Sequence, residues 1–598
     1  MPNHDLSGIS LPINPPSTSS GFNFFRFFAP QTNHDFMQQP IYVLGTGLSH
    51  NGSAVLLKDG KVFVAIEKER LTRRKHDGGN DTTAITYCLE AAGITLKDVA
   101  VVVQCANFDI PDRNRFMGQR LFNDSEKPPL VNISHQLAHA YSAAGTCNFD
   151  TCNIMVIDGC GSPFDQCTDI SESTVLPDDV KRHHHEQLWC EKDSFYHFDG
   201  QKVRALYKDF SPFVMGNGNA IRLSTTQHSI GGFYAAVSHY VFGNLDDVGK
   251  LMGLAPYGKA NQLDLQAFSI ENGRLFVRDE WKTQLTQPFA GYEQFKTHFQ
   301  YYANVAWWAQ QQVEQAVMAC FRERLNQFPH HNICYSGGVA LNAVANAQLL
   351  ENKVVENLYM EPAAGDNGLA LGCAFYGWLE VLNQPKVPHD GNTCFGKSYT
   401  SEEIEQALQH TGFSFQQVAT TTMIATTAQY LAEGKTIGWF QGGAEFGPRA
   451  LGHRSILAHP GIEGIGDHIN ANIKFREDFR PFAPATLPAA APEYFVSGRE
   501  SPYMILVDKT RLEYLEQLKN VTHVNGTARV QTVDPQWNPA FYALIEAFGR
   551  LTETPVLLNT SFNKKGMPIV ETPQQAVDLF AESALDILVM ENFVVQKP

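Results

Sequence analysis

The chain has 598 residues, a formal net charge of −16 and 43% hydrophobic residues. This length predicts two or three domains, and the composition excludes a disordered chain. An acidic surface gives nucleic acid little overall attraction, and no apolar stretch reaches the ~20 residues that span a bilayer. We therefore expect a protein that binds neither nucleic acid nor membrane. The 11 cysteines include no CxxC pair, so we expect reduced thiols in a cytoplasmic protein.

The N-terminal segment differs from the rest of the chain. Residues 1–39 are rich in Pro, Ser and Asn and contain an aromatic run from Phe22 to Phe28. The basic start, apolar core and cleavage site of a secretory signal do not occur there in order, so we expect an irregular extension. Folded sequence is predicted to follow, beginning with a hairpin that turns at Asp59-Gly60.

A segment dense in charge follows this hairpin. It runs from Glu67 and ends at the turn residues Asp77-Gly-Gly79. One interpretation is a charged face in contact with solvent. The other is a substrate-facing loop that contains Arg73 to His76, with many hydrogen-bond donors.

Two histidines and two aspartates have the spacing of a metal site. His135 and His139 are four residues apart, which places them on one face of a helix. Asp158 ends an apolar run that is typical of a buried strand, and Asp366 closes a second motif, PAAGD. Such a set of nitrogen and oxygen ligands suits Fe(II), Zn(II) or Mn(II) and leaves a position open for substrate. Two ordinary helix histidines are the alternative interpretation.

The middle of the chain gives weaker signals. Residues 165–225 are predicted to be irregular, and three adjacent histidines, His183 to His185, are expected on the surface because consecutive side chains do not converge. Residues 301–325 are predicted to form a long helix. The following strand ends in Ser336-Gly-Gly, and a helix that starts at these glycines would seat a nucleotide phosphate or ribose.

A domain boundary is predicted where proline and glycine interrupt the pattern, near 384–400. A helix then restarts at Thr400, where Glu403 completes a capping box. The final helix is predicted to open at Thr572-Pro573. We therefore expect a second domain over residues 395–598.

Basic residues in this second domain lie among Gly, Pro and aromatic residues. Guanidinium groups match phosphate and carboxylate oxygens, and such groups stabilise charge on a transferring phosphoryl group. The alternative is that each one pairs with a nearby acid, which we expect for Arg476 but not for the others. The others are Arg449, Arg454, Lys474, Arg480 and Arg529.

These motifs, in this order, resemble the O-carbamoyltransferases that modify nodulation factors, cephamycins, aminoglycosides and other natural products. The resemblance covers residues 41–598 and rests on GLSHNGSA, EKERLTRRKH, SHQLAHA with VIDGCG, GKLMGLAPYG, YSGGVALNAVAN with PAAGDNG, and GAEFGPRALGHRSILAHP with IKFREDFRPFAP. It implies an α/β protein. Residues 40–390 would be an actin-like ATPase domain of the ASKHA superfamily, similar to Kae1, and residues 395–598 an α/β domain similar to YrdC.

The resemblance also implies the reaction. The YrdC-like domain would make carbamoyl-adenylate from carbamoyl phosphate and ATP, with Mg²⁺ accompanying ATP, and would release phosphate and pyrophosphate. In the Kae1-like domain a hydroxyl of a small-molecule acceptor would attack the carbamoyl carbon, and AMP would leave.

The resemblance assigns roles to residues at matching motif positions. Carbamoyl phosphate would be held by Lys474, Arg480 and Arg529. The ATP phosphates would be surrounded by Arg449, Arg454 and Ser561, and the adenylate pocket lined by Gly337, Gly338 and Asn342. Iron(II) or another divalent ion would be bound by His135, His139, Asp158 and Asp366. Because imidazole titrates near neutrality, His50 or His76 is our candidate for taking the hydroxyl proton, with a structural role for either as the alternative.

Other functions remain open. A tRNA threonylcarbamoylation enzyme shares these domain types, although the acidic charge disfavours tRNA. A non-catalytic actin-like nucleotide-binding protein would keep the glycine loops but would not need the basic cluster. For the acceptor, the acidic charge favours a cationic molecule such as an aminoglycoside or a saxitoxin-type alkaloid, and we expect a homodimer.

Overall fold

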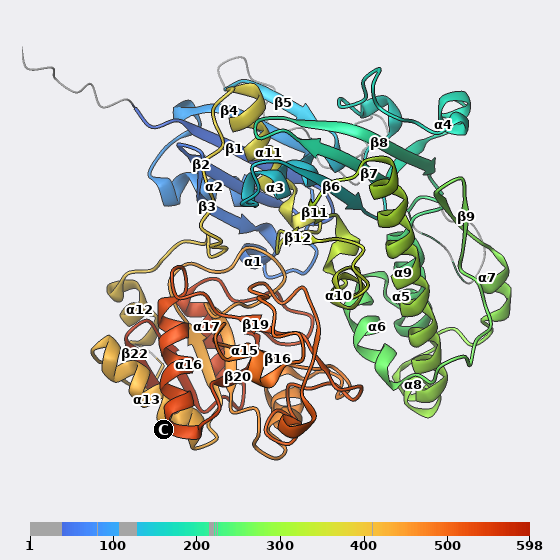
Figure 1. Ribbon diagram of the computed structural model, residues 1–598. Coiled ribbons are helices and arrows are strands. Elements are labelled where there is room, and N and C mark those ends of the chain that lie inside the picture. Colours follow the sequence, from blue (N-terminus) through green and yellow to red (C-terminus); the bar gives the residue numbers. More distant parts are fainter. Residues whose placement is uncertain are drawn as a thin grey trace, which may run out of the picture. The chain divides into compact units, whose positions relative to one another are not determined.

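Two five-stranded sheets with the same strand order make up the first part of the chain (Figure 1). The computed structural model describes residues 39–79, 82–106, 128–214, 221, 223, 225–409 and 411–598. The predicted irregular extension, residues 1–39, lies almost entirely outside the described residues. Residues 41–598 form one unit, to which the following description applies.

The first sheet has the order β3-β2-β1-β4-β5. Its central strand β1 pairs antiparallel with β2 and parallel with β4. The predicted hairpin is confirmed, because β2 and β3 meet at Asp59 (φ 52°) and Gly60 (φ 78°), the backbone of a two-residue turn. The strands are β1 (Tyr42–Leu48), β2 (Ser53–Lys58), β3 (Lys61–Glu67), β4 (Val99–Ala106) and β5 (Leu130–Ile133).

The second sheet repeats this plan in the order β12-β11-β6-β7-β8. Its central strand β6 pairs antiparallel with β7 and parallel with β11. The strands are β6 (Cys152–Ile157), β7 (Trp189–Phe198), β8 (Val203–Pro212), β11 (Asn332–Ser336) and β12 (Asn357–Met360). This duplicated order is that of the actin-like ATPase fold and confirms the fold predicted for this part of the chain.

The prediction that residues 165–225 are irregular is wrong. They contain α4 (Asp178–His183) and two ten-residue strands, β7 and β8. The sequence pattern did not indicate these strands because they contain charged residues that are buried as ion pairs. Lys192 of β7 pairs with Asp209 of β8 at 3.0 Å, and Glu191 pairs with Lys208. A hydrophobicity pattern therefore does not mark these strands.

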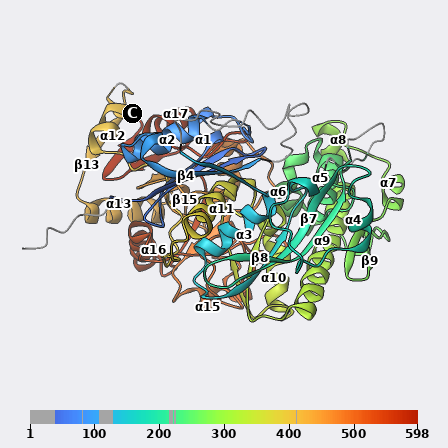
Figure 2. The ribbon, with the colours of Figure 1, turned by 90° about the horizontal axis from the view of Figure 1, so that it is seen from above.

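Helices α3 (His135–Thr146) and α11 (Leu369–Tyr376) lie side by side (Figures 1 and 2). Every residue of α3 is buried. The two helices approach so closely that a Cβ atom at Gly372 would lie 1.7 Å from the carbonyl oxygen of Ala138. Glycine is therefore required at this crossing.

Further helices pack on the two sheets or join their strands. The predicted helix over 301–325 is confirmed as α9 (Phe299–Gln327). The helix after Ser336-Gly-Gly does not start at the glycines: α10 (Ala343–Glu351) begins after a 3-10 turn, because Asn342 caps it by accepting from the Ala345 N–H. The remaining elements here are α1 (Lys68–Thr72), α2 (Thr82–Ala92), α5 (Ile230–Phe242), α6 (Val248–Leu254), α7 (Glu280–Gln284), α8 (Tyr292–Thr297), β9 (Phe268–Glu271) and β10 (Arg274–Val277).

An eight-stranded mixed sheet lies in the last third of the chain, in the order β13-β22-β21-β14-β15-β20-β16-β19. Its strands are β13 (Ser414–Gln417), β14 (Ile437–Phe440), β15 (Arg454–Ala458), β16 (Ala483–Thr486), β19 (Gln531–Thr532), β20 (Val556–Ser561), β21 (Ile587–Met590) and β22 (Phe593–Gln596). The short pair β17 (Asp508–Lys509) and β18 (Thr527–Ala528) lies outside it. The YrdC likeness and the boundary near 390–395 stay predictions.

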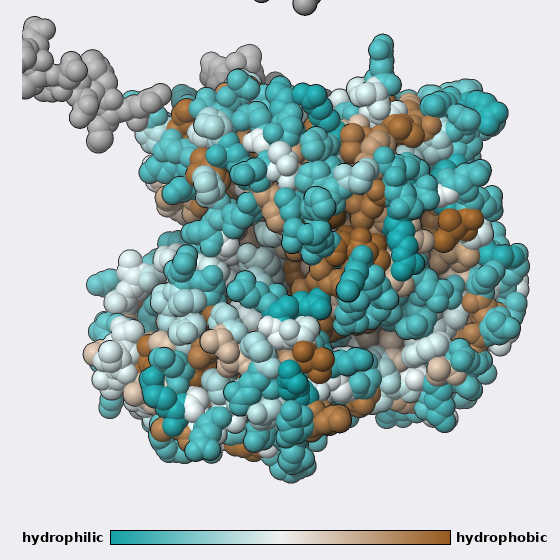
Figure 3. All heavy atoms as spheres, viewed as in Figure 1, coloured by the Kyte–Doolittle hydropathy of each residue, from teal (hydrophilic) through white to brown (hydrophobic). Residues whose placement is uncertain are grey.

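Two predicted helix starts in this region are confirmed. Thr400 and Glu403 form the capping box of α12 (Ser401–Leu408), and Thr572 caps α17 (Pro573–Glu582). The other helices are α13 (Thr420–Ala432), α14 (Ile465–His468), α15 (Ala491–Tyr494) and α16 (Pro539–Thr552). Figure 3 shows a mostly hydrophilic face, with hydrophobic residues gathered in its middle. No helix in the described part of the chain has the length and apolar character needed to cross a membrane.

Gly372→Ala is expected to lower the free energy of unfolding by about 3 kcal/mol, because the added methyl group forces α3 away from α11. Urea unfolding followed by circular dichroism measures the change. Gly249→Ala in α6 is the matched control, since nothing lies within 4 Å of a Cβ atom there. Equal stability of the two variants would contradict the packing described.

Candidate active site

The four predicted metal ligands come together at one point. His135 opens α3, Asp158 directly follows β6, and Asp366 begins the short turn before α11. His135 Nε2 lies 2.8 Å from Asp158 Oδ2, 3.2 Å from His139 Nε2 and 3.4 Å from Asp366 Oδ1. One ligand atom from each of the four lies within 4.8 Å of those of the others. We call these four residues the His/Asp group.

Neighbouring residues orient both carboxylates. Asp158 Oδ1 accepts from the backbone N–H groups of Gly159 (2.8 Å) and Gly338 (3.2 Å), which leaves Oδ2 to face the imidazoles. Asp366 Oδ2 contacts the Ser49 hydroxyl and lies 3.0 Å from His50 Nδ1, which leaves Oδ1 to face them. Such outer contacts are typical of residues that bind a metal.

The electrostatics of the His/Asp group fit a divalent cation. Burial alone raises the pKa of Asp158, but hydrogen bonds with His135 and His139 outweigh it and lower that pKa below its usual range. Burial lowers the pKa of His139, but its hydrogen bonds with the two aspartates raise it. Two ionised carboxylates therefore attract positive charge here, and a divalent ion can replace the protons on the imidazoles. The donor set suits Fe(II), Zn(II) or Mn(II).

A second pair of histidines lies beside Asp366. The rings of His50 and His76 stack with their centroids 5.9 Å apart, and the Asn51 side chain lies 3.3 Å from His50 Nε2 and 2.9 Å from His76 Nδ1. Desolvation lowers the pKa of His50, but the hydrogen bond with Asp366 raises it to about 9. Desolvation lowers the pKa of His76 more than Asp246 raises it. His76 is therefore the imidazole that stays neutral at pH 7.

A cavity of about 1210 Å³ extends from His76 to the basic residues of the C-terminal region. Eleven lysines and arginines line it, and we call five of them, from the C-terminal region, the cationic cluster. These are Arg449, Lys474, Arg476, Arg480 and Arg529. Since His76 and the cationic cluster line one cavity, a small molecule inside it can reach both.

The cationic cluster lacks matching negative charge. Burial and the neighbouring cation Arg480 lower the pKa of Arg449 to about 10, and burial with three neighbouring arginines lowers the pKa of Arg529 well below its usual range. The buried Nε atoms of Arg449 and Arg529 have no hydrogen-bond partner among the described residues. Within the part of the chain that the structure describes, the only ion pair of the cationic cluster is a distant one, 4.0 Å between Arg480 and Glu477. A polyanion is the ligand that such a site fits.

Sequence reasoning misassigned two arginines. Arg476 was expected to pair with an acid, but it lines the cavity and its Nε donates to Asn470 Oδ1 at 2.6 Å. Arg454 was expected at the ATP phosphates, but it is fully buried outside the cavity lining. Its guanidinium donates to the carbonyls of Gln441 (2.9 Å) and Gly442 (3.0 Å). Arg454 is the first residue of β15, a strand in which every residue is buried, and the sequence gives no sign that this arginine is buried too.

Lys474, predicted at carbamoyl phosphate, and Ser561, predicted at the ATP phosphates, both line the cavity and contact each other. Lys474 Nζ donates to Ser561 Oγ at 3.0 Å and to Asn563 Oδ1 at 2.7 Å. The predicted adenylate residues Gly337, Gly338 and Asn342 are not in the cavity lining. The glycines lie against Ile157 and Asp158, and Asn342 exchanges hydrogen bonds with Gln310, which does line the cavity.

Residues of the predicted substrate-facing loop make two kinds of contact. Lys75 and His76 line the cavity. Arg73 instead donates to the carbonyl oxygens of Ile569 (2.7 Å) and Pro568 (2.8 Å), which ties this loop to the C-terminal region. Sequence reasoning also missed two further residues near His76, Asn51 and Asp246. Asn51 lies in the motif GLSHNGSA, which could have indicated it as a site residue.

Comparisons with known proteins match the same two regions. The family model described as carbamoyltransferase N-terminus matches residues 43–115 and 112–375, and the one described as carbamoyltransferase C-terminus matches residues 428–597. The chain belongs to the carbamoyltransferase family. The resemblance seen in the sequence is thereby confirmed, and so is the prediction that the protein is a carbamoyltransferase enzyme.

Individual proteins similar to this carbamoyltransferase include two nodulation proteins. The nodulation protein NolNO of Sinorhizobium fredii is 31% identical over 92% of this chain and 79% of the relative. The nodulation protein NolO of Bradyrhizobium diazoefficiens is 33% identical over 64% of this chain and 72% of the relative. Among solved structures, HypF of T. kodakarensis matches over 58% of this chain and 50% of the HypF chain, with a TM-score of 0.35 and 16% identity. This likeness is too distant to support a functional inference.

Inorganic phosphate is expected to raise the melting temperature of the carbamoyltransferase by about 2–4 °C relative to chloride of equal ionic strength, because an anion neutralises the cationic cluster. Arg529→Met should abolish this shift without lowering the melting temperature in chloride. Arg550→Met, at a residue whose side chain is 66% exposed, should keep the shift. Scanning calorimetry measures both, and a normal phosphate shift in Arg529→Met would contradict the anion site.

Proposed function

We propose that this protein is an ATP-dependent O-carbamoyltransferase that works in two steps. Carbamoyl phosphate, ATP and one water give carbamoyl-adenylate, pyrophosphate and phosphate. A hydroxyl of a small-molecule acceptor then attacks the carbamoyl carbon, the bond between that carbon and the AMP oxygen breaks, and AMP leaves with the electron pair. Membership of the carbamoyltransferase family supports the group transferred, and relatives named nodulation proteins support a natural-product acceptor.

The cationic cluster carries the first step of this proposal. ATP and carbamoyl phosphate are both polyanions, and an electrostatic site that is positive before they bind stabilises charge without reorganising. Lys474, Arg480 and Arg529 are proposed to hold carbamoyl phosphate, with Arg449 and Ser561 at the ATP phosphates. We add Arg476 to this set because it lines the same cavity.

The second step is proposed near His76, which lines the same cavity. His76 is the better candidate for accepting the hydroxyl proton, because it lines the cavity and its lowered pKa keeps it neutral at pH 7. Its Nδ1 donates to Asn51 Oδ1, which fixes the ring and leaves Nε2 free to accept. His50, which contacts Asp366, is proposed to position that carboxylate.

The His/Asp group is proposed to hold iron(II) or a similar divalent ion, which when bound would act as a Lewis acid toward the adenylate. The chain's own contribution is orientation. Gly159 and Gly338 fix one aspartate, while Ser49 and His50 fix the other. Mg²⁺ is proposed to enter with ATP.

Acidic side chains support a cationic acceptor. Glu69, Asp246 and Asp247 line the cavity together with His76 and the cationic cluster. These carboxylates favour an acceptor that carries amino or guanidinium groups, such as an aminoglycoside or a saxitoxin-type alkaloid, because they attract positive charge.

With ATP and carbamoyl phosphate together, the wild-type protein is expected to release both pyrophosphate and phosphate, and with either substrate alone to release neither. Lys474→Met should slow this release about 100-fold or more, because a cation that faces the transferring group is lost. Lys181→Met, at an exposed position far along the chain from the cavity lining, should leave it unchanged. Normal release by Lys474→Met, or none by the wild type, would contradict the first step.

His76→Gln is expected to slow carbamoyl transfer to an acceptor about 100-fold, since general base catalysis is lost, while the release of pyrophosphate stays normal. The acceptor for this assay is one that gains a carbamoyl group by mass spectrometry in a panel of hydroxylated amines. His331→Gln, whose side chain is 85% exposed, is the control. Unchanged transfer in His76→Gln would exclude His76 as the base.

A further inference from the structure

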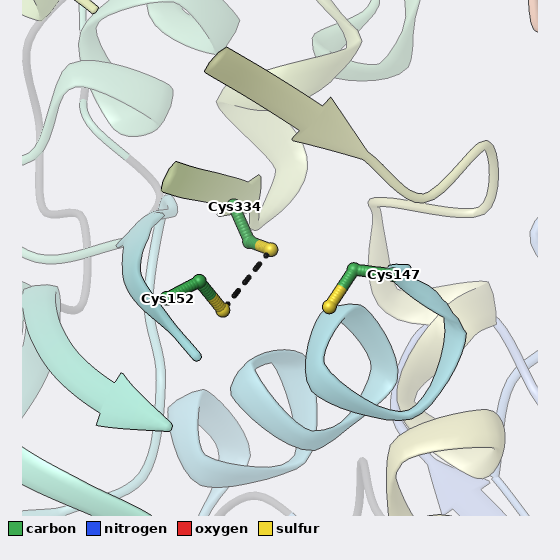
Figure 4. A group of neighbouring side chains, drawn as sticks. All are labelled: Cys147, Cys152 and Cys334. Atoms are coloured by element: carbon green, nitrogen blue, oxygen red, sulfur yellow. Dashed lines mark hydrogen bonds between the residues drawn. The ribbon is translucent and has the colours of Figure 1, made fainter. Parts of the chain in front are cut away.

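Three buried cysteines meet at the ends of α3 and β6 that lie away from the His/Asp group. Cys147 directly follows α3, Cys152 is the first residue of β6, and Cys334 lies in β11. Figure 4 shows the three thiols pointing toward one another from these three elements. The sulfur atoms of Cys152 and Cys334 are 3.5 Å apart, and all three lie within 4.8 Å of one another. We call them the thiol cluster.

The thiol cluster is sealed from solvent and carries no disulfide. All three cysteines have 0% exposure. Sulfur atoms that each lie about 2.3 Å from one tetrahedral zinc ion are about 3.8 Å apart, so the observed spacing requires only small side-chain adjustments to enclose a metal ion. Thiolates favour soft ions such as zinc(II) and copper(I) over the harder ions that imidazole and carboxylate groups bind.

A lysine beside the thiol cluster supplies an independent observation. Lys386 Nζ lies 3.4 Å from Cys147 Sγ and donates to the carbonyl oxygens of Cys147 (2.7 Å) and Phe149 (3.1 Å). Within the described residues, no carboxylate forms an ion pair with Lys386. Three thiolates and one zinc(II) ion have a net charge of −1, which this ammonium group neutralises. A purely apolar cysteine core would have no need of such a cation.

We propose that Cys147, Cys152 and Cys334 bind a thiophilic metal ion, zinc(II) or copper(I), at a structural site separate from the His/Asp group. Binding forms three metal–sulfur bonds and releases the three thiol protons to solvent. The ion would tie together the three elements that position the other site. Helix α3 carries His135 and His139, β6 leads to Asp158, and β11 leads to Gly338, which binds Asp158.

Cobalt(II) substitution of the full-length protein tests this site. Thiolate-bound cobalt(II) absorbs strongly in the near ultraviolet through sulfur-to-metal charge transfer, and the His/Asp group, which has no sulfur ligand, cannot produce that band. The wild type and His139→Ala are expected to show the band, while Cys147→Ser and Cys334→Ser lose it. Cys88→Ser is the matched control, since Cys88 is equally buried but lies outside the thiol cluster.

Metal analysis of protein purified without added metal identifies the ion. We expect one equivalent of zinc or copper that His139→Ala retains and that a mercurial thiol reagent releases from the wild type, a measurement that needs no variant to fold. Absence of the charge-transfer band in the wild type would overturn the proposal. So would a Cys152–Cys334 disulfide in protein prepared without reductant, or a band that persists in both serine variants.

Discussion

The structure depends on a group of buried positive charges that the chain does not neutralise. Arg449 and Arg529 have buried Nε atoms with no partner among the described residues, and burial together with neighbouring cations lowers their pKa values. Each unpaired ion in such a place costs several kcal/mol, so the fold must hold these side chains in position through other contacts. The buried pair Glu67–Arg70 supplies one: both bind the backbone of Gly447, directly before the loop that carries Arg449.

The same cavity connects two kinds of chemistry. The cationic cluster fits polyanionic substrates, and His76 and acidic groups line the same cavity. His76 also lies in a chain of side chains that leads through Asn51 and His50 to Asp366, a member of the His/Asp group. Under the proposed two-step reaction, the activated carbamoyl group would stay within one cavity between the two steps.

The sequence predicted the elements with a local signal and missed those decided by tertiary contacts. The spacing of His135 and His139 indicated the helix face, and the Asp-Gly turn and capping boxes marked their elements, because each depends on a few adjacent residues. Strands β7 and β8 were missed, since their charges are neutralised across the sheet. Arg454 was predicted at a ligand and Arg476 in an ion pair, whereas Arg454 binds backbone carbonyls and Arg476 lines the cavity. The burial of these side chains depends on how the folded chain packs around them, which local sequence does not reveal.

The measurement that tests this account most directly follows oxygen from carbamoyl phosphate to AMP. The substrate is labelled with oxygen-18 at the carbonyl and bridging oxygens of its carbamoyl group and incubated with ATP, the wild-type protein and the hydroxylated amine that gains a carbamoyl group by mass spectrometry. The AMP released is examined by phosphorus NMR. Our account predicts one oxygen-18 atom in the AMP phosphate, because the carbamoyl oxygen becomes the bridge to AMP and stays with it. AMP without the label, or labelled phosphate with no AMP formed, would contradict the carbamoyl-adenylate and the role given to the cationic cavity.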